Sequence, residues 1–345
     1  MLLKRIILLF TIAVLFTFPA RGEYATIFVY HRFGDNRYPT TSASMEDFEK
    51  QMEFLKKNNY NVISLDELWQ MAEYGERIPP KTVVITIDDG YRTTMKAFKV
   101  LKKYNFPFAV FLYMEAIGRY PDFLTIEQIE ELKKYGKVTF GNHMYSHPDL
   151  AKYRASLKEE EYIEFLKKES ELSEKRFKEL FGERPEFFAF PYGSYDRLSV
   201  KFLERRGYKL LMTQDRGSYN GKSILVPRMA TVGSFSNFKT FYRALKIEPL
   251  PIKNYSPIYG LLKENPAKIS FELENGENYK NCSIYVSEYG WLKAKRTGNR
   301  IETKERIKFH RFKNRIGIRC INKKKNRKAE FFYLVINGSQ EGANR

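Results

Sequence analysis

Histidine and cysteine are scarce in this chain of 345 residues, which contains four His and two Cys. Two of the four histidines, His143 and His147, lie only four residues apart. No Cys follows the N-terminal leader closely, and we therefore expect no lipid anchor. The apolar run near the start of the chain, residues 6–19, is too short to span a bilayer comfortably.

The first 22 residues have the pattern of a secretory signal peptide. Lys4 and Arg5 precede the apolar run, and Ala20 and Gly22 supply small residues at the −3 and −1 positions of a cleavage site. An uncleaved membrane anchor is the alternative. We therefore expect a secreted, periplasmic or cell-surface protein, and export argues against a nucleic-acid partner.

Negative charge is in short supply. The chain has 60 Lys and Arg against 41 Asp and Glu, a formal net charge of +19. Much of the excess lies in residues 266–345, which contain 19 basic and 8 acidic residues. A basic exported region favours anionic partners such as envelope polymers. A solvated basic surface without a partner is equally consistent with the composition.

Two adjacent carboxylates, Asp88 and Asp89, follow a run of mostly β-branched residues, Thr82–Ile87. Such a run is typical of a buried strand in a parallel sheet. Neighbouring buried carboxylates repel each other unless a cation or hydrogen-bond donors share their charge. An ordinary strand-ending turn, completed by Gly90, is the alternative interpretation.

A second short strand, residues 137–141, is followed by His143 and His147. Histidines at positions i and i+4 can face a common point on one helical turn. Two histidines and one carboxylate form a known catalytic metal set that leaves positions open for water and substrate.

Three short motifs together resemble those of the polysaccharide deacetylases, carbohydrate esterase family 4. Residues 86–90 are similar to the family motif T-F-D-D-G, residues 143–147 to H-[ST]-x-x-H, and residues 190–193 to R-x-P-Y. The likeness extends from about residue 26 to residue 228.

The chain departs from each motif at one position, where Ile87, Met144 and Ala189 replace Phe, a hydroxyl residue and Arg. The family uses the missing Arg to orient its catalytic base. We expect Arg228, at the end of a strand over residues 224–226, to take its place.

The resemblance implies a role for each matching residue. It places a divalent metal ion, expected to be zinc, on Asp89, His143 and His147. It makes Asp88 the general base, and it assigns the oxyanion-stabilising backbone N–H to Tyr192, next to Pro191.

The family's late motif, L-x-I-x-L-x-H, which supplies the catalytic acid, is absent from this sequence. After His147 the remaining histidine is His310, outside the expected barrel. Tyr30 and His31 resemble a branch of the family with Y-H on the first strand. We therefore expect His31 to protonate the leaving amine, with a purely structural histidine as the alternative.

Strand and helix patterns alternate over the first domain, residues 23–248. This alternation predicts a parallel sheet that closes into a distorted (β/α) barrel of about seven strands. The predicted site residues each follow a strand, which is where such barrels place their active sites. Strands are expected at residues 26–30, 61–64, 82–87, 107–113, 137–141, 187–190, 208–213 and 224–226.

Four prolines and little periodicity mark residues 249–266 as a linker. The short alternating strands beyond it predict a small all-β, immunoglobulin-like sandwich over residues 267–337, with 338–345 as a tail. Its strands are expected at residues 269–273, 282–286, 291–295, 305–309, 315–321 and 330–335.

The two cysteines, Cys282 and Cys320, each share a strand face with aliphatic residues, and both are expected in the core of the sandwich. Export would permit a disulfide between them. Buried free thiols are equally consistent with this pattern.

Together these features predict an exported, metal-dependent hydrolase that removes N-acetyl groups from N-acetylglucosamine residues of a polysaccharide. Peptidoglycan and chitin oligomers are alternative substrates. A non-catalytic glycan-binding protein is an alternative function, although none of the metal set is missing. A non-haem iron oxygenase would leave the second Asp unexplained, and a glycosidase would have no need of the histidine pair.

Overall fold

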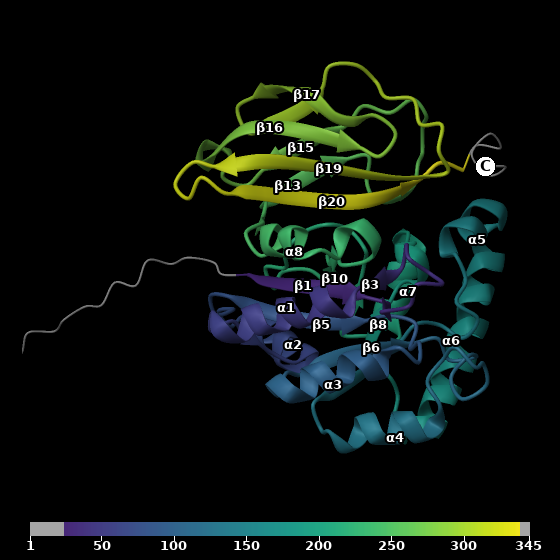
Figure 1. Cartoon of the computed structure of the whole chain (residues 1–345). Helices are drawn as coiled ribbons and strands as arrows, with labels where there is room; N and C mark the ends of the chain where they lie inside the picture. Colours follow the sequence, from purple (N-terminus) through teal and green to yellow (C-terminus); the bar gives the residue numbers. More distant parts are fainter. Residues whose placement is uncertain (1–23, 339–345) are drawn as a thin grey trace, which may run out of the picture.

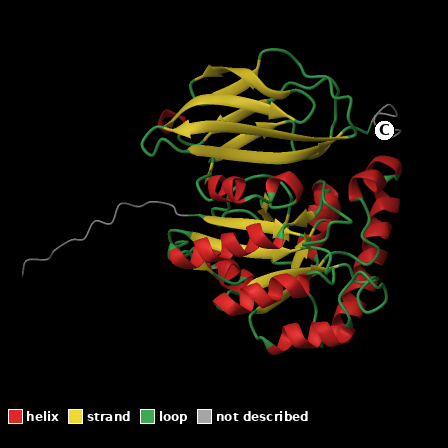
Figure 2. Ribbon diagram, in the orientation of Figure 1, coloured by secondary structure: helices red, strands yellow, loops and turns green. Residues whose placement is uncertain are grey.

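The computed structural model describes residues 24–338 and contains two domains packed on each other (Figure 1). Figure 2 shows an α/β domain below and an all-β domain above. The predicted signal peptide, and the predicted tail apart from Gly338, lie outside the described residues. Within residues 24–338, no helix combines the length and apolarity needed to cross a membrane.

The first domain is built on one parallel sheet. Its nine strands are β1 (Ala25–Tyr30), β4 (Asn61–Val62), β5 (Thr82–Ile87), β6 (Phe108–Leu112), β7 (Val138–Asn142), β8 (Phe187–Ala189), β9 (Leu210–Met212), β10 (Leu225–Val226) and β11 (Met229–Ala230). The order is β10-β9-β8-β7-β6-β5-β1-β11, and β4 also pairs with β5. Because the end strands β10 and β11 are neighbours in the chain, the sheet curls back on itself, and the predicted distorted barrel is confirmed.

Helices cover the outside of this curled sheet (Figures 1 and 2). Serine and threonine caps explain where several of them begin, since Ser44, Ser64 and Thr125 each accept a hydrogen bond from the first turn. The helices are α1 (Met45–Lys57), α2 (Leu65–Glu73), α3 (Thr94–Tyr104), α4 (Ile126–Lys134), α5 (Leu150–Ser156), α6 (Glu159–Phe181), α7 (Arg197–Arg205) and α8 (Phe238–Ala244). A small ladder of β2 (Arg32–Phe33) and β3 (Ser42–Ala43) lies beside them.

The central strands are buried on both faces, which explains their continuous apolar sequences. Alternate residues enter different clusters: Phe28 and Ile85 join the cluster that contains residues of α1 and α3. Ile27 and Val84 join a second cluster on the opposite face.

The second domain is all-β, as predicted. Its strands are β12 (Glu248–Pro249), β13 (Ile252–Ser256), β14 (Gly260–Leu261), β15 (Ser270–Leu273), β16 (Tyr279–Val286), β17 (Gly290–Thr297), β18 (Arg300–Thr303), β19 (Lys313–Asn322) and β20 (Lys328–Ile336). The first half of β17 pairs with β16 and its second half with β18, so the sheet folds over a core that includes Ile284 and Ile318. The immunoglobulin-like topology stays a prediction.

The prediction of a linker over residues 249–266 is wrong. This stretch supplies β13, β14 and part of β12, all of which pair with strands of the second domain. Its prolines led to the linker prediction, because proline is uncommon inside strands. Pro249 is accommodated in β12 because this strand lies at the edge of the sheet. The boundary between the domains therefore lies close to Glu248.

One predicted strand of the sandwich is misplaced. Residues 305–309 make only an isolated bridge, between Ile307 and Ala267. The strand in this region is instead β18, where Ile301 and Thr303 are buried and alternate with charged residues. Four residues are too few for that alternation to be recognised in the sequence.

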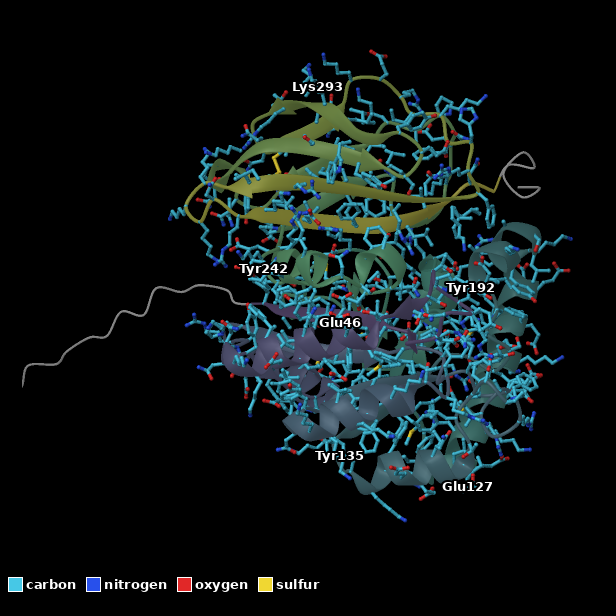
Figure 3. All side chains as sticks on the ribbon, in the orientation of Figure 1. Glu46, Glu127, Tyr135, Tyr192, Tyr242 and Lys293 are labelled. Carbon is cyan, nitrogen blue, oxygen red and sulfur yellow. A yellow bond between two sulfur atoms is a disulfide. The ribbon has the colours of Figure 1, made fainter. Side chains whose placement is uncertain are left out.

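Side chains from both domains fill the space between them (Figure 3). Leu334 and Ile336 of β20 belong to the same apolar cluster as Leu150 and Phe190 of the barrel. An ion pair between Arg216 and Glu330, at 2.6 Å, also crosses this interface. The sandwich is therefore packed firmly on the barrel.

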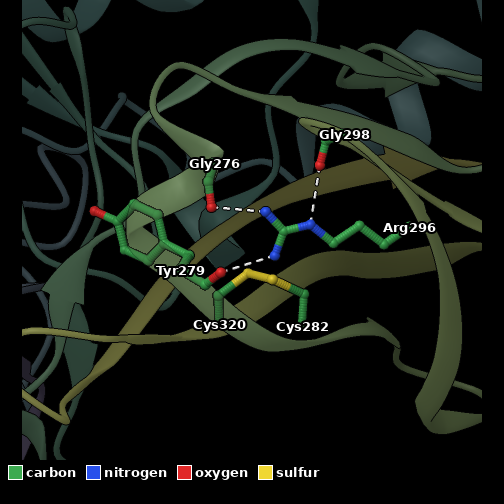
Figure 4. Close-up of a disulfide and its surroundings, with 6 residues drawn as sticks. All are labelled: Gly276, Tyr279, Cys282, Arg296, Gly298 and Cys320. Atoms are coloured by element: carbon green, nitrogen blue, oxygen red, sulfur yellow. Dashed lines mark hydrogen bonds between the residues drawn. A yellow bond between two sulfur atoms is a disulfide. The ribbon is translucent and has the colours of Figure 1, made fainter.

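Cys282 of β16 and Cys320 of β19 form a disulfide (Figure 4), so the second of the two alternatives, free thiols, does not apply. The bond closes a loop with a sequence separation of 38. A loop of this size restricts the unfolded chain by an amount worth on the order of 4 kcal/mol. Nearby, the Arg296 guanidinium donates hydrogen bonds to three backbone carbonyls, those of Gly276, Tyr279 and Gly298.

Candidate active site

The predicted site residues meet at one end of the curled sheet, where its parallel strands terminate. Asp88 and Asp89 follow β5, His31 follows β1, and His143 follows β7. Arg228 lies in the two-residue gap between β10 and β11, where the two edges of the sheet approach each other. Strand direction thus brings together residues that are nearly 200 positions apart in the chain.

Asp89, His143 and His147 place three potential ligand atoms in one small triangle. Nε2 of each histidine lies 3.1 Å from Asp89 Oδ1, and the two Nε2 atoms are 3.2 Å apart. A tetrahedral zinc ion with bonds of about 2.0–2.1 Å holds its ligands roughly 3.3 Å apart. Apart from these two nitrogens, the buried Asp89 Oδ1 has no hydrogen-bond partner among the described residues, as expected of an atom directed at a cation. The residues fit one divalent ion.

The pKa values of the three candidate ligands shift in different directions. Burial acts to raise the pKa of Asp89, but hydrogen bonds from His143 and His147 bring that pKa well below its ordinary value. Burial lowers the pKa of His147, which favours the neutral ring that binds metals. For His143, burial acts in the same direction, but Asp89 and Asp88 outweigh it and raise the pKa.

Neighbouring residues hold the ring of His143 and the residue next to His147. His143 Nδ1 lies 2.8 Å from the carbonyl oxygen of Ala189, to which it donates when Nε2 is the ligand atom. Next to His147, both the backbone N–H and the hydroxyl of Ser146 donate to Glu169, at 3.0 and 2.7 Å. Glu169 lies on α6 and was not predicted, because nothing in its helix distinguishes it from other charged residues.

The backbone around the cluster is bent in an unusual way. Asp89, Met144, His147 and Tyr192 all have positive φ angles, of 70°, 63°, 54° and 56°. Residues with a Cβ rarely adopt this left-handed conformation, and they persist there only where surrounding contacts hold them. Four such residues around one cluster indicate that the ligand geometry is maintained at a cost in local stability.

Asp88 and Arg228 form a completely buried ion pair beside the cluster of Asp89, His143 and His147. The two terminal nitrogens of Arg228 each donate to one Asp88 oxygen, both at 2.7 Å. Arg228 is fixed in turn by the Thr213 carbonyl and the Thr86 hydroxyl. Burial acts to raise the pKa of Asp88, but the positive charge of Arg228 keeps it below its ordinary value. The predicted contact between Arg228 and Asp88 is therefore present.

His31 lies beside the two carboxylates. The register pairs Tyr30 with Ile87, so His31 and Asp88 continue side by side beyond the ends of β1 and β5. Among the smaller effects on the two carboxylates, a charge on His31 would lower the pKa of Asp88 and of Asp89. Its Nδ1 atom is buried and has no hydrogen-bond partner among the described residues.

Tyr192 lies in a tight turn, Pro191–Gly193, directly after β8. Its ring is 4.7 Å from the ring of His147, and 55% of the residue is exposed. Pro191 is buried beneath it. Figure 3 labels Tyr192 on the side of the barrel nearest the sandwich.

Three aromatic residues that the sequence analysis missed lie around the cluster. Tyr113 is 5.4 Å from His147 between ring centres, and Phe123 contacts both Tyr113 and Tyr91. Tyr113 directly follows β6, so the strand-end rule could have identified it. Tyr91 and Phe123 meet through an isolated bridge between two loops, for which the sequence carries no periodic signal.

Comparisons with known proteins agree with this geometry. Residues 75–211 match the model of the polysaccharide deacetylase family. YxkH of Bacillus subtilis, provisionally named a polysaccharide deacetylase, is 26% identical over 193 residues, which cover 56% of this chain and 65% of that protein. The match thus spans just under two thirds of that relative's length.

Two further proteins are similar to the barrel. Poly-β-1,6-N-acetyl-D-glucosamine N-deacetylase of Staphylococcus aureus is 23% identical over 216 residues, covering 61% of this chain and 74% of that protein. The solved structure of the Streptococcus pyogenes deacetylase PplD in complex with acetate superposes with a TM-score of 0.56 at 19% identity. It covers 64% of this chain and 98% of PplD, and it shows the shared barrel fold.

Residues 75–211 of the barrel are therefore similar to the polysaccharide deacetylase family. The three motifs that suggested this assignment all lie at the mouth of the barrel, around the Asp89, His143 and His147 cluster.

Proposed function

We propose that this protein is an exported, divalent-metal-dependent hydrolase that removes N-acetyl groups from N-acetylglucosamine residues of a polysaccharide. The observation that carries the proposal is the buried cluster of Asp89, His143 and His147 next to the ion pair of Asp88 and Arg228. The activity named for the Staphylococcus aureus relative supports a β-1,6-linked polymer as the substrate.

Asp89, His143 and His147 would hold the metal ion, and zinc suits their one oxygen and two nitrogen donors. When bound, such an ion would act as a Lewis acid that polarises the acetyl carbonyl and makes water easier to deprotonate.

The remaining residues divide the proton transfers between them. Asp88, kept charged and oriented by Arg228, accepts a proton from the water that attacks the acetyl carbonyl carbon. The backbone N–H of Tyr192 donates to the carbonyl oxygen as it becomes negative. His31 protonates the amine nitrogen as the C–N bond breaks, so that acetate and a free amino sugar leave.

The aromatic residues at the mouth support a sugar substrate. Tyr91, Tyr113, Phe123 and Tyr192 lie around the cluster, where their ring faces can pack against pyranose rings. The half-exposed ring of Tyr192 is the one that a polymer would meet first.

Export and an anionic partner complete the proposal. The disulfide between Cys282 and Cys320 supports an oxidising location. The turn between β19 and β20 and the first residue of β20 carry five exposed basic residues within 323–328, which we propose as a contact for an anionic envelope polymer. Binding of such a polymer should weaken with salt, and it should be reduced in the Lys323→Gln, Lys324→Gln double variant; equal binding by both proteins would reject this contact.

The test of the activity is a panel of three substrates: a β-1,6-linked N-acetylglucosamine polymer, peptidoglycan and chitin oligomers. The zinc-loaded protein should release acetate and free amine in equal amounts from the first, and Asp88→Asn should release neither at a comparable rate. If acetate is released only from peptidoglycan or only from chitin oligomers, that polymer replaces the β-1,6-linked polymer as the proposed substrate. Glycan binding with neither zinc uptake nor acetate release would instead establish a non-catalytic binding protein.

A further inference from the structure

Strand β19 of the sandwich reaches the catalytic end of the barrel. A terminal nitrogen of Arg315 donates to the carbonyl oxygen of Gly193 at 2.9 Å, and the other lies 3.1 Å from Asp215 Oδ1. Gly193 belongs to the turn that carries Tyr192, and Asp215 is buried just beyond β9. Arg315 of the second domain thus contacts two loops of the barrel, and it is 122 positions from Gly193 in sequence.

A second side chain of β19 approaches the same turn. Lys313 Nζ pairs with Asp149 at 2.6 Å and donates to the Ser194 hydroxyl at 3.2 Å. The same nitrogen lies 5.6 Å from the centre of the Tyr192 ring. The sandwich therefore contacts the turn both at Gly193 and at the residue after it.

The turn is a segment whose own conformation is unfavourable. Tyr192 and Gly193 have consecutive positive φ angles, of 56° and 58°. For Tyr192 this conformation is unfavourable, and it persists because surrounding contacts offset its cost. A Cβ atom on Gly193 would lie 2.7 Å from the Arg315 guanidinium, so the glycine leaves the room that Arg315 occupies.

The interface behind the turn is a buried polar network. The Tyr195 hydroxyl donates to Asp215, and it accepts a hydrogen bond from the backbone N–H of Leu334 on β20. Asp215 is thus held between Tyr195 of the barrel and Arg315 of the sandwich. Such a network is sensitive to the loss of any one member.

We propose that Arg315 is a positioning residue of the active site, which holds the Tyr192 turn against His147, so that full activity requires the sandwich docked on the barrel. Arg315 acts through the Gly193 carbonyl and touches none of the residues assigned to the chemistry. The inference rests on the proposed function for its kinetic consequences, but not for its structural ones.

The test compares Arg315→Gln with Arg319→Gln in the full-length, zinc-loaded protein. Arg319 is the control, because it lies four residues further along the same strand and pairs with the buried Glu330, which keeps its second partner, Arg216 of the barrel, when Arg319 is replaced. Arg315→Gln should lower kcat by about 10-fold with a smaller change in KM, because a displacement of about 1 Å can cost up to 100-fold. Arg319→Gln should stay within about twofold of the wild type, and Arg315→Lys, which can still donate to Gly193, should recover part of the loss.

A second measurement does not depend on activity. Hydrogen–deuterium exchange of peptides covering residues 189–195 should become faster in Arg315→Gln and remain unchanged in Arg319→Gln. If Arg315→Gln fails to fold because Asp215 is left unpaired, the double variant Asp215→Asn, Arg315→Gln removes that charge and takes its place in both assays.

The outcomes separate the two proposals. Equal kcat and equal exchange in the Arg315 and Arg319 variants would overturn the positioning role. A wild-type protein that releases acetate from no N-acetylated polymer would reject the proposed function, and the exchange comparison alone would then decide the role of Arg315.

Discussion

Replacing Arg228 by Met tests whether this guanidinium is what allows Asp88 to stay charged inside the barrel. Both side chains are completely buried, and Arg228 supplies two hydrogen bonds of 2.7 Å to the carboxylate. Methionine is also long and unbranched, so the substitution removes the charge and the donors while filling much of the same space.

The expected cost follows from the burial. Removing one partner of a buried ion pair leaves the other charge uncompensated, which typically destabilises a protein by about 3–5 kcal/mol. Domains of this kind are stable by about 5–15 kcal/mol, so the variant should still fold. Without Arg228, burial dominates and raises the pKa of Asp88, and a protonated Asp88 cannot accept a proton from water. Activity should therefore fall together with stability.

The pH dependence has a definite sign. In the wild type the pKa of Asp88 is below its ordinary value of 3.8, so its stabilising contribution is present above that value and is lost in more acidic solution. In Arg228→Met the pKa of Asp88 is raised. As the pH falls, Asp88 therefore becomes protonated, and the variant no longer contains an uncompensated buried charge. The stability difference between the two proteins should thus be largest near neutral pH and should shrink towards pH 4.

Urea denaturation of the wild type, Asp88→Asn, Arg228→Met and the double variant measures these free energies. The double variant should be more stable than the sum of the two single losses predicts, by about 2 kcal/mol or more. Arg37→Met is the control, because Arg37 also pairs with carboxylates, those of Asp35 and Asp122, but its side chain is 62% exposed. Strictly additive losses, or a loss no larger than that of Arg37→Met, would refute the reasoning.

Four further substitutions test the remaining assignments. His147→Ala should lose its bound zinc and its activity while staying folded, and stoichiometric zinc by elemental analysis would contradict this role. Asp88→Asn should keep zinc but lose activity on the order of 100-fold; an empty metal site would mean that the two neighbouring carboxylates have exchanged roles. His31→Ala should keep zinc and lower kcat on an amide on the order of 100-fold, with a smaller effect on an ester, whereas unchanged amide hydrolysis would place the acid elsewhere. Burial acts to raise the pKa of Glu174, but its ion pair with Arg206 lowers it below 4.5, so this pair stabilises the protein above that pH and the benefit is lost in more acidic solution. Thermal unfolding should show Glu174→Gln less stable than the wild type by about 1 kcal/mol at pH 7, since partial solvent access screens the pair, and a constant difference down to pH 3 would be the contrary result.

The candidate metal ligands could be predicted because the signals that locate them are local. The run Thr82–Ile87 identifies a buried strand by its β-branched residues, and the polar residues directly after it are then at a strand end. Parallel strands bring such ends together whatever their separation in the chain. The spacing of His143 and His147 is likewise a property of a few consecutive residues.

The errors arose where a local signal was weak or misleading. Prolines between residues 249 and 266 indicated a linker, although β13 pairs there with β15 and β14 pairs with the distant strand β20. Short edge strands make few contacts along the chain, and their pairing depends on partners far away in sequence. Tyr91 and Phe123 were missed for the same reason, because two loops must meet before the rings contact each other.

The sequence by itself determined the chemistry that the barrel mouth can hold: two carboxylates, two histidines at metal-ligand spacing and an acid candidate, each following a recognisable strand. Only the tertiary structure decided how these groups are held. The ion pair of Arg228 with Asp88 joins residues 140 positions apart, and the contact of Arg315 with Gly193 joins two domains. Contacts of this kind depend on how the sheet curls and how the sandwich docks, and neither leaves a periodic pattern in the residues involved, because each is formed by single side chains that meet only after the chain has folded.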